Sequence, residues 1–293
     1  MRKHFKYLRP ATPAEAVEMK ASYGDRSRFW AGGTDLLLQW QRGEVGLDYC
    51  IDLSFTSGLD HLERVNGDLR IGATASLARL ERAGDMHPLA AYLASVAKVM
   101  CTPQTRTLAT VGGNLCNASP AADLAPPLLV LDGEARILGS NGERTVALAE
   151  FFTGVNTTVL DEDELLLDVR VPLEPARQTG FGRVGRTAVD IALVVAAASL
   201  SSNGDGKIGA ARIAIGSVAP TPIRAREAEE LLVGADVAEL DGLLGEAAVR
   251  AAADTEPISD VRTTAAYRKE VSRVLVERSL TDAVSKLRVE GGA

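Results

Sequence analysis

Cysteine and histidine are scarce in this chain of 293 residues, which has three of each. The cysteines form none of the close thiol pairs that hold zinc or an iron–sulfur cluster, so any such cluster would belong to another chain. The histidines show no metal-ligand spacing such as HExxH. These six residues are Cys50, Cys101, Cys116, His4, His61 and His87. The sequence therefore predicts no metal site of its own.

Long apolar runs are also missing. The longest run, residues 191–200, is far shorter than the roughly 20 residues that cross a bilayer. The basic segment of residues 1–10 is not followed by an apolar stretch of signal-peptide length. We therefore expect a cytoplasmic protein without a membrane span.

The chain has no excess of positive charge. Its 32 Lys and Arg residues face 39 Asp and Glu residues, which gives a formal net charge of −7. This balance argues against nucleic acid or an anionic membrane as the main partner. The length and the 46% hydrophobic content predict two or three domains, each with its own core.

The residue patterns predict a mixed α+β chain. Thr12, Pro13 and Glu15 supply a capping residue, a first-turn proline and a capping-box glutamate, so a helix should run from there to Tyr23. Strands are predicted at 28–31, 50–53, 69–73, 136–138, the end of 164–172 and 211–215. Helices are predicted at 34–42, 88–100, 224–233, 237–253 and 265–287. The polar residues 173–180 predict a connection between domains.

Two glycine pairs are the most informative feature. They lie in the segments Ala31-Gly32-Gly33-Thr34-Asp35 and Thr110-Val111-Gly112-Gly113-Asn114. Glycine lets backbone N–H groups turn toward an anion, so the two segments together predict a grip on a pyrophosphate, whereas a single pair is more often a turn. A side chain at Gly112 or Gly113 is then expected to enter phosphate space and leave most of the fold intact. Neither segment fits GxGxxG or GxxxxGK[ST].

With further motifs, these segments resemble the FAD-binding medium subunit of the xanthine dehydrogenase and carbon monoxide dehydrogenase family, the molybdenum hydroxylases. The motifs are 31–35, Gln104-Thr105-Arg106, 110–124, Asp190-Ile191-Ala192, 219–225 and 267–278. The resemblance implies an α+β fold with a vanillyl-alcohol-oxidase-type FAD domain of two subdomains and a C-terminal α+β domain. The implied bounds are 1–56, 57–175 and 176–293.

The resemblance also implies roles for single residues. The first FAD loop would comprise Phe29, Trp30, Ala31, Gly32, Gly33, Thr34, Asp35 and Leu36, and the second Thr110, Val111, Gly112, Gly113 and Asn114. Asp123 would contact the adenosine part, although it could instead cap a helix that starts at Leu124. The backbone of Leu166 would meet the flavin. Arg183 would lie on the flavin side, with Arg186 as the alternative. Thr34 stands where related carbon monoxide dehydrogenases often have histidine, so covalent flavin is not expected.

The function implied by the resemblance is electron transfer through FAD on this chain. A large subunit with a molybdopterin cofactor and a small subunit with [2Fe-2S] clusters would be the partners, as a dimer of heterotrimers. Electrons would leave for NAD, oxygen or another acceptor, and this chain would need no catalytic residue of its own. Two alternatives stay open. One is a self-sufficient FAD oxidase, with Cys101 or Cys116 as possible flavin tethers, and the other is a non-catalytic assembly protein.

Overall fold

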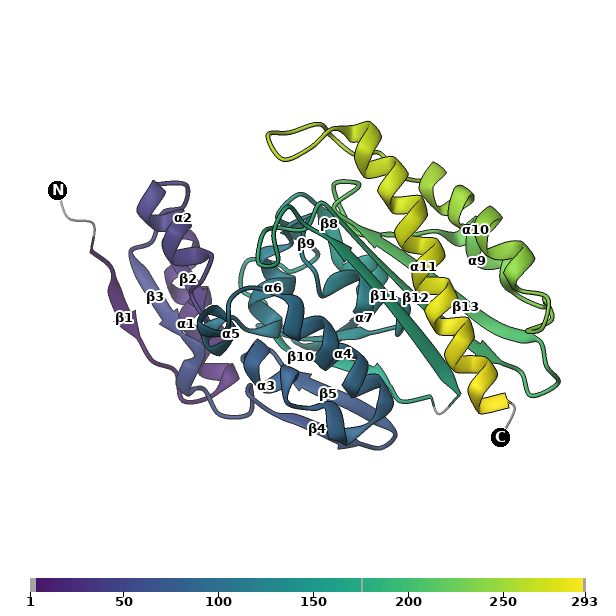
Figure 1. Cartoon of the computed structure of the whole chain (residues 1–293). Coiled ribbons are helices and arrows are strands. Elements are labelled where there is room, and N and C mark those ends of the chain that lie inside the picture. The colour runs from purple at the N-terminus through teal and green to yellow at the C-terminus, as the bar shows by residue number, and fades with distance from the viewer. Residues whose placement is uncertain (1–3, 175, 292–293) are drawn as a thin grey trace.

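The computed structural model describes residues 4–174 and 176–291, so the start of the basic N-terminal segment lies outside the described residues. In these ranges the strands form sheets of three, five and four strands and one two-stranded ribbon. The chain runs through the three larger sheets in order, from one end of the molecule to the other (Figure 1). None of the helices in the described ranges is both long and apolar enough to span a membrane.

The first sheet is parallel, with strand order β1-β3-β2. Its elements are β1 (Lys6–Leu8), α1 (Pro13–Tyr23), β2 (Ser27–Trp30), α2 (Leu36–Arg42) and β3 (Tyr49–Asp52). The predicted start of α1 is confirmed, because Thr12 Oγ1 accepts a bond from the Glu15 amide at 3.2 Å. The helix predicted from Thr34 begins two residues later, at Leu36, so residues 31–35 form a loop.

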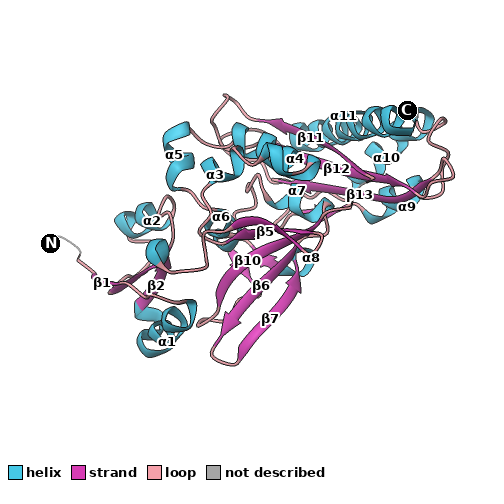
Figure 2. Ribbon diagram, turned by 90° about the horizontal axis from the view of Figure 1, so that it is seen from below, coloured by secondary structure: helices cyan, strands magenta, loops and turns pink. Residues whose placement is uncertain are grey.

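The second sheet is antiparallel, with strand order β4-β5-β10-β6-β7. The strands are β4 (Leu62–Val65), β5 (Asp68–Gly72), β6 (Glu134–Gly139), β7 (Gly142–Ala147) and β10 (Leu165–Pro172), with the ribbon β8 (Phe152–Gly154) and β9 (Thr157–Thr158) nearby. The helices are α3 (Leu77–Glu81), α4 (Pro88–Val99), α5 (Pro103–Leu108), α6 (Val111–Asn117), α7 (Ala125–Val130) and α8 (Leu148–Phe151). Figure 2 shows β5, β10, β6 and β7 edge to edge.

Strand β10 is where the first two sheets meet. Its register shifts between Leu166 and Asp168, which is a β-bulge. Leu165 and Leu167 pack with Ala16 of α1, whereas Leu166 packs in the core of the second sheet. The strand therefore supports both units, and it lies beside the site described below.

The third sheet is antiparallel, with order β11-β12-β13-β14. It comprises β11 (Arg177–Val184), β12 (Val194–Ser202), β13 (Ile208–Gly216) and β14 (Ile223–Arg224), followed by α9 (Arg226–Leu232), α10 (Asp241–Ala253) and α11 (Ala265–Gly291). On β12, Ala196 and Ala198 pack in the core that includes the three helices, and Ala197 packs in the core of the second sheet. Burial of both faces explains the apolar run around this strand.

The connection predicted at 173–180 is shorter in the structure, because β11 already begins at Arg177. Its guanidinium is buried and donates to the carbonyl of Val130 at 3.3 Å and to Asp132 at 3.0 Å. The polar start of β11 therefore has the composition of a loop, but it packs against the end of the segment that contains α7. Because each sheet is confined to one stretch of chain, we propose domain bounds of 1–56, 57–175 and 176–293.

Asp132, two residues after the end of α7, joins the second sheet's unit to the third. Besides Arg177, it lies 3.1 Å from Arg212 Nε and 3.5 Å from Arg224 Nη1. Asp132 has a left-handed backbone, with φ of 51°. One carboxylate thus lies among three arginines of the C-terminal unit, and its charge should stabilise the contact between the two units.

Replacing Asp132 by asparagine tests this interface. The change keeps the size and the tolerance of a left-handed backbone but removes the charge. We expect the free energy of unfolding to fall by about 1–2 kcal/mol, since the carboxylate is only partly buried. Urea denaturation measures the effect, and Asp85→Asn at an exposed position is the control. Equal curves for the two variants would show that the carboxylate does not stabilise the interface.

Candidate cofactor site

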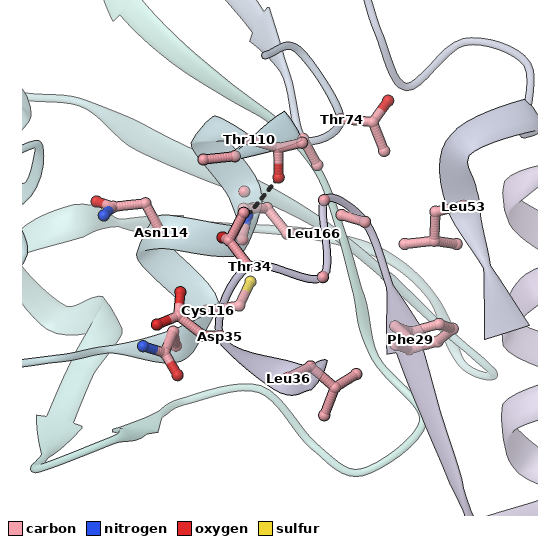
Figure 3. A pocket seen from close by; sticks show the side chains of 18 of the residues that line it. Phe29, Thr34, Asp35, Leu36, Leu53, Thr74, Thr110, Asn114, Cys116 and Leu166 are labelled. Carbon is pink, nitrogen blue, oxygen red and sulfur yellow. Dashed lines mark hydrogen bonds between the residues drawn. The ribbon is translucent and has the colours of Figure 1, made fainter. Parts of the chain in front are cut away.

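A cavity of about 290 Å³ lies between the loop before α2, the start of α6 and strand β10 (Figure 3). Both glycine segments line it, although they are far apart in the sequence. The predicted residues in its walls are Phe29, Ala31, Gly32, Gly33, Thr34, Asp35, Leu36, Thr110, Gly112, Gly113, Asn114 and Leu166. The structure therefore brings most of the predicted site residues to one cavity.

Four predicted residues are not among those that line the cavity. The Trp30 ring packs beside Phe5, with the ring centroids 6.1 Å apart, and would lie against any side chain at Gly33. Val111 is fully buried in the core. Asp123 and Arg183 pair with each other and are described below. Trp30 and Val111 thus pack within the protein and do not line the cavity.

The glycines of the site allow separate backbone segments to approach closely. A Cβ at Gly32 would lie 1.9 Å from the Leu108 carbonyl oxygen, and one at Gly112 would lie 2.6 Å from the Ala73 carbonyl oxygen. Gly33 has φ of 68°, a left-handed conformation that favours glycine. The expectation that a side chain at Gly112 enters phosphate space is therefore wrong, because the side chain would meet Ala73 and damage the packing.

The two glycine segments differ in their free backbone donors. Within the described residues, the amides of residues 32–35 donate no hydrogen bond. In the second segment, the Gly112 amide donates to Ala73 O at 2.9 Å and the Gly113 amide to Thr110 Oγ1 at 3.0 Å. The second segment is thus the capped first turn of α6, and the expectation that its glycines turn free N–H groups toward a pyrophosphate is wrong. Only the first segment offers a row of free amides.

Asn114 contributes a second unsatisfied group to the cavity wall. Its Oδ1 is buried and has no hydrogen-bond partner within the described residues. The next asparagine on α6, Asn117, is satisfied, because Gln39 Nε2 donates to its Oδ1 at 3.1 Å. That bond also joins α2 to α6 across the cavity. A buried carbonyl without a donor is rare in proteins, and one in a cavity wall is able to accept a hydrogen bond from a ligand.

Charges at the cavity are few. Among the described residues that line it, Arg28 is the cation. Burial raises the pKa of the Asp35 carboxyl, and the hydrogen bonds of Arg144 lower the pKa of Glu164. The predicted FAD contacts leave out about half of the wall: Arg28, Gln39, Leu53, Ala73, Thr74, Leu77, Cys101, Ala109, Cys116, Asn117, Leu160, Glu164 and Leu165. Of these, the sequence pointed only to Cys101 and Cys116, as possible tethers in the oxidase alternative, because they are close to the second glycine pair.

Asp123 and Arg183 form an ion pair between the second and third units. Arg183 Nε donates to Asp123 Oδ1 at 2.9 Å, and the two side chains are only 9% and 12% exposed, respectively. Burial raises the pKa of Asp123, although Arg183 opposes the shift. The alternative that Asp123 caps a helix is wrong, since α7 begins at Ala125 without a side-chain cap. Arg186 is half-exposed, so the geometry favours Arg183 as the basic residue near the site.

This ion pair lies close to the cavity wall. Burial raises the pKa of the Cys101 thiol, and the charges of Asp123 and Asp35 raise it further, whereas Arg183 lowers it. Because Cys101 lines the cavity, both members of the pair are within electrostatic reach of the site. Asp123 and Arg183 therefore lie near the cavity, but their side chains bond to each other.

The donor set fits FAD. Free amides at 32–35 suit phosphate oxygens, and the Asn114 carbonyl suits a hydroxyl or ring N–H donor. Apolar side chains such as Phe29, Leu36 and Leu166 suit the rings. The fold and the cavity thus define an FAD-binding protein with an additional C-terminal domain.

Comparison with known families agrees. The FAD binding domain in molybdopterin dehydrogenase matches residues 3–174, and the CO dehydrogenase flavoprotein C-terminal domain matches residues 180–283. The chain belongs to the family of FAD-binding subunits of xanthine dehydrogenase and carbon monoxide dehydrogenase, and it is an oxidoreductase subunit.

Individual relatives match over nearly their whole length. The xanthine dehydrogenase FAD-binding subunit of Escherichia coli O157:H7 is 30% identical over 285 residues, which cover 95% of this chain and 96% of the relative. The carbon monoxide dehydrogenase medium chain of Afipia carboxidovorans is 29% identical, with 96% and 97% covered. The crystal structure of quinoline 2-oxidoreductase from Pseudomonas putida 86 matches with a TM-score of 0.90 at 29% identity, with 98% and 99% covered.

Proposed function

We propose that this chain holds FAD in the cavity and is the electron exit of a molybdenum hydroxylase complex. Electrons would arrive from the [2Fe-2S] clusters of a small subunit, supplied by a large molybdopterin-containing subunit, and leave for NAD, oxygen or another acceptor. The assembly would be a cytoplasmic dimer of heterotrimers. The names of relatives as medium chains or FAD-binding subunits support this proposal.

The observation that carries the proposal is that one cavity is lined both by residues 32–35, whose amides are free, and by Asn114, whose carbonyl is unpartnered. The amides would donate to the diphosphate of the cofactor. A phosphate cannot satisfy Asn114 Oδ1, which needs a donor such as a ribityl or ribose hydroxyl. When bound, FAD supplies an isoalloxazine that accepts and releases one or two electrons. Leu36 and Leu166 would exclude water from the rings.

The two alternatives are less well supported. A flavin tether requires a thiolate, but burial raises the pKa of Cys116 to about 12 and also raises that of Cys101. A non-catalytic assembly protein would have no need for an unpartnered carbonyl in a cavity. Denaturing mass spectrometry of the chain purified with FAD tests the first alternative, since we expect the mass of the bare polypeptide. Purification from the host tests the second, since we expect yellow protein with two partner chains, and a folded chain that takes up no FAD would contradict our proposal.

Asn114→Leu should have opposite effects on the apoprotein and on cofactor binding. Removing the unpartnered carbonyl should stabilise the apoprotein by about 1 kcal/mol, while FAD affinity should fall about tenfold because a hydrogen bond is lost. Thermal unfolding and fluorescence titration with FAD measure the two effects. Asn117→Leu is the matched control and should destabilise the apoprotein, because its carbonyl accepts from Gln39. Unchanged FAD affinity in Asn114→Leu would contradict the site.

A further inference from the structure

The turn between α4 and α5 has an unusual backbone. Cys101 has φ of 50°, in the left-handed region that non-glycine residues rarely adopt. The residue before it, Met100, is the C-cap of α4 and is buried in the core. Cys101 also lines the cavity. A strained residue in a cofactor cavity persists only where its surroundings hold it in place.

Arg106 holds this turn. It is buried on α5, and its Nη1 donates to Met100 O at 2.9 Å and to Cys101 O at 3.1 Å. Its Nε and Nη2 donate to the two carboxylate oxygens of Glu81 on α3, at 2.8 Å and 3.3 Å. One guanidinium therefore joins α3 to both carbonyls of the turn. Lysine has a single ammonium and cannot reproduce this planar fork.

Arg106 contrasts with the rest of its helix. Pro103, Gln104, Thr107 and Leu108 of α5 are exposed, whereas Arg106 points inward. A buried cation requires partners, and here two of the three acceptor groups are the turn carbonyls. The bonds to these carbonyls thus fix where the chain enters the cavity wall, while the bond to Glu81 balances the charge.

We propose that Arg106 is a positioning residue of the FAD site: its bonds to the Met100 and Cys101 carbonyls hold the left-handed turn and so set Cys101 into the cavity wall, where the cofactor covers it. This inference rests on the proposed function. It assigns Arg106 an indirect role, through the turn, and assigns Cys101 a place against the cofactor without any covalent bond.

Alkylation of the full chain with iodoacetamide, read by peptide mass spectrometry, tests the inference. In the wild type we expect saturating FAD to slow modification of Cys101 by about tenfold or more, since a covered thiol is inaccessible. In Arg106→Lys we expect FAD affinity to fall about tenfold. The protection of Cys101 should also be lost at saturating FAD. Lower stability alone would not remove protection once the cofactor is bound.

Three variants complete the experiment. Glu81→Gln keeps the carbonyl bonds and should bind FAD as the wild type does, and so should Arg82→Lys at an exposed position. Adding Cys101→Gly to Arg106→Lys should restore FAD affinity, because glycine adopts the left-handed conformation without strain. Wild-type affinity and protection in Arg106→Lys, or no protection in the wild type with FAD bound, would overturn the inference. A wild-type chain that binds no FAD would instead overturn the proposed function.

Discussion

Gly32→Ala is expected to lower the free energy of unfolding by about 3 kcal/mol or more and to abolish most FAD binding. The added Cβ would lie 1.9 Å from the carbonyl oxygen and 2.6 Å from the carbonyl carbon of Leu108. Both are backbone atoms at the end of α5, so rotation of a side chain cannot relieve the clash. The loop and α5 would have to separate.

Separation would also disturb the cofactor site. Gly32 is the first of the free amides, and Ala109, which follows Leu108, lines the same cavity. Any shift that accommodates the methyl group therefore moves amide donors away from the opposite wall. Thermal unfolding and the flavin absorbance of the purified protein would measure the two losses together.

Gly46→Ala is the matched control. A Cβ at Gly46 meets nothing within 4 Å, and this residue is not among the glycines with positive φ. The free energy of unfolding of the Gly46→Ala variant should stay unchanged or rise by up to about 1 kcal/mol, because alanine restricts the unfolded chain. A Gly32→Ala protein with wild-type unfolding temperature and full FAD content would contradict the close approach.

Local chemistry explains which elements could be predicted from the sequence. The start of α1 depends on Thr12 and Glu15, which are adjacent to it, so the pattern is sufficient. Helix α6 was not predicted, because Gly112 and Gly113 have low helix propensity. It forms because Thr110 caps it and because the Gly112 amide bonds to Ala73, a residue distant in sequence. Tertiary contact here outweighs propensity.

The candidate site could likewise be predicted from the sequence only in part. The glycine pairs were visible as motifs, but the motif could not show that one pair is a loop with free amides and the other a helical turn. The partner of Asp123 was also hidden, since Arg183 lies on a strand of another unit. Such pairings depend on how the sheets pack, which no local pattern contains.

Asp123→Ala should lower the free energy of unfolding by about 3 kcal/mol, because it leaves Arg183 buried without its carboxylate. This is more than the roughly 1 kcal/mol expected from a lost hydrogen bond to a cofactor. Urea denaturation of the apoprotein measures the loss without any contribution from FAD.

The double variant Asp123→Leu with Arg183→Met should recover most of that stability. Burial raises the pKa of Asp123 despite the attraction of Arg183, so desolvation outweighs the pairing. A buried ion pair of this kind can be replaced by apolar side chains at little cost. If the double variant loses as much stability as Asp123→Leu and Arg183→Met lose together when measured singly, the two residues are not coupled.

The pH dependence and FAD affinity of the double variant then separate two roles of Asp123. Because the pKa of this carboxyl is higher in the folded chain than its ordinary value of 3.8, the stability it contributes falls as pH rises from about 3.8 through the folded pKa. The double variant lacks this loss, so its stability relative to the wild type should increase across that range and then level off. A stable double variant with weakened FAD binding would support a cofactor contact by Asp123. Wild-type affinity would mean that the carboxylate serves only to join the two units beside the cavity.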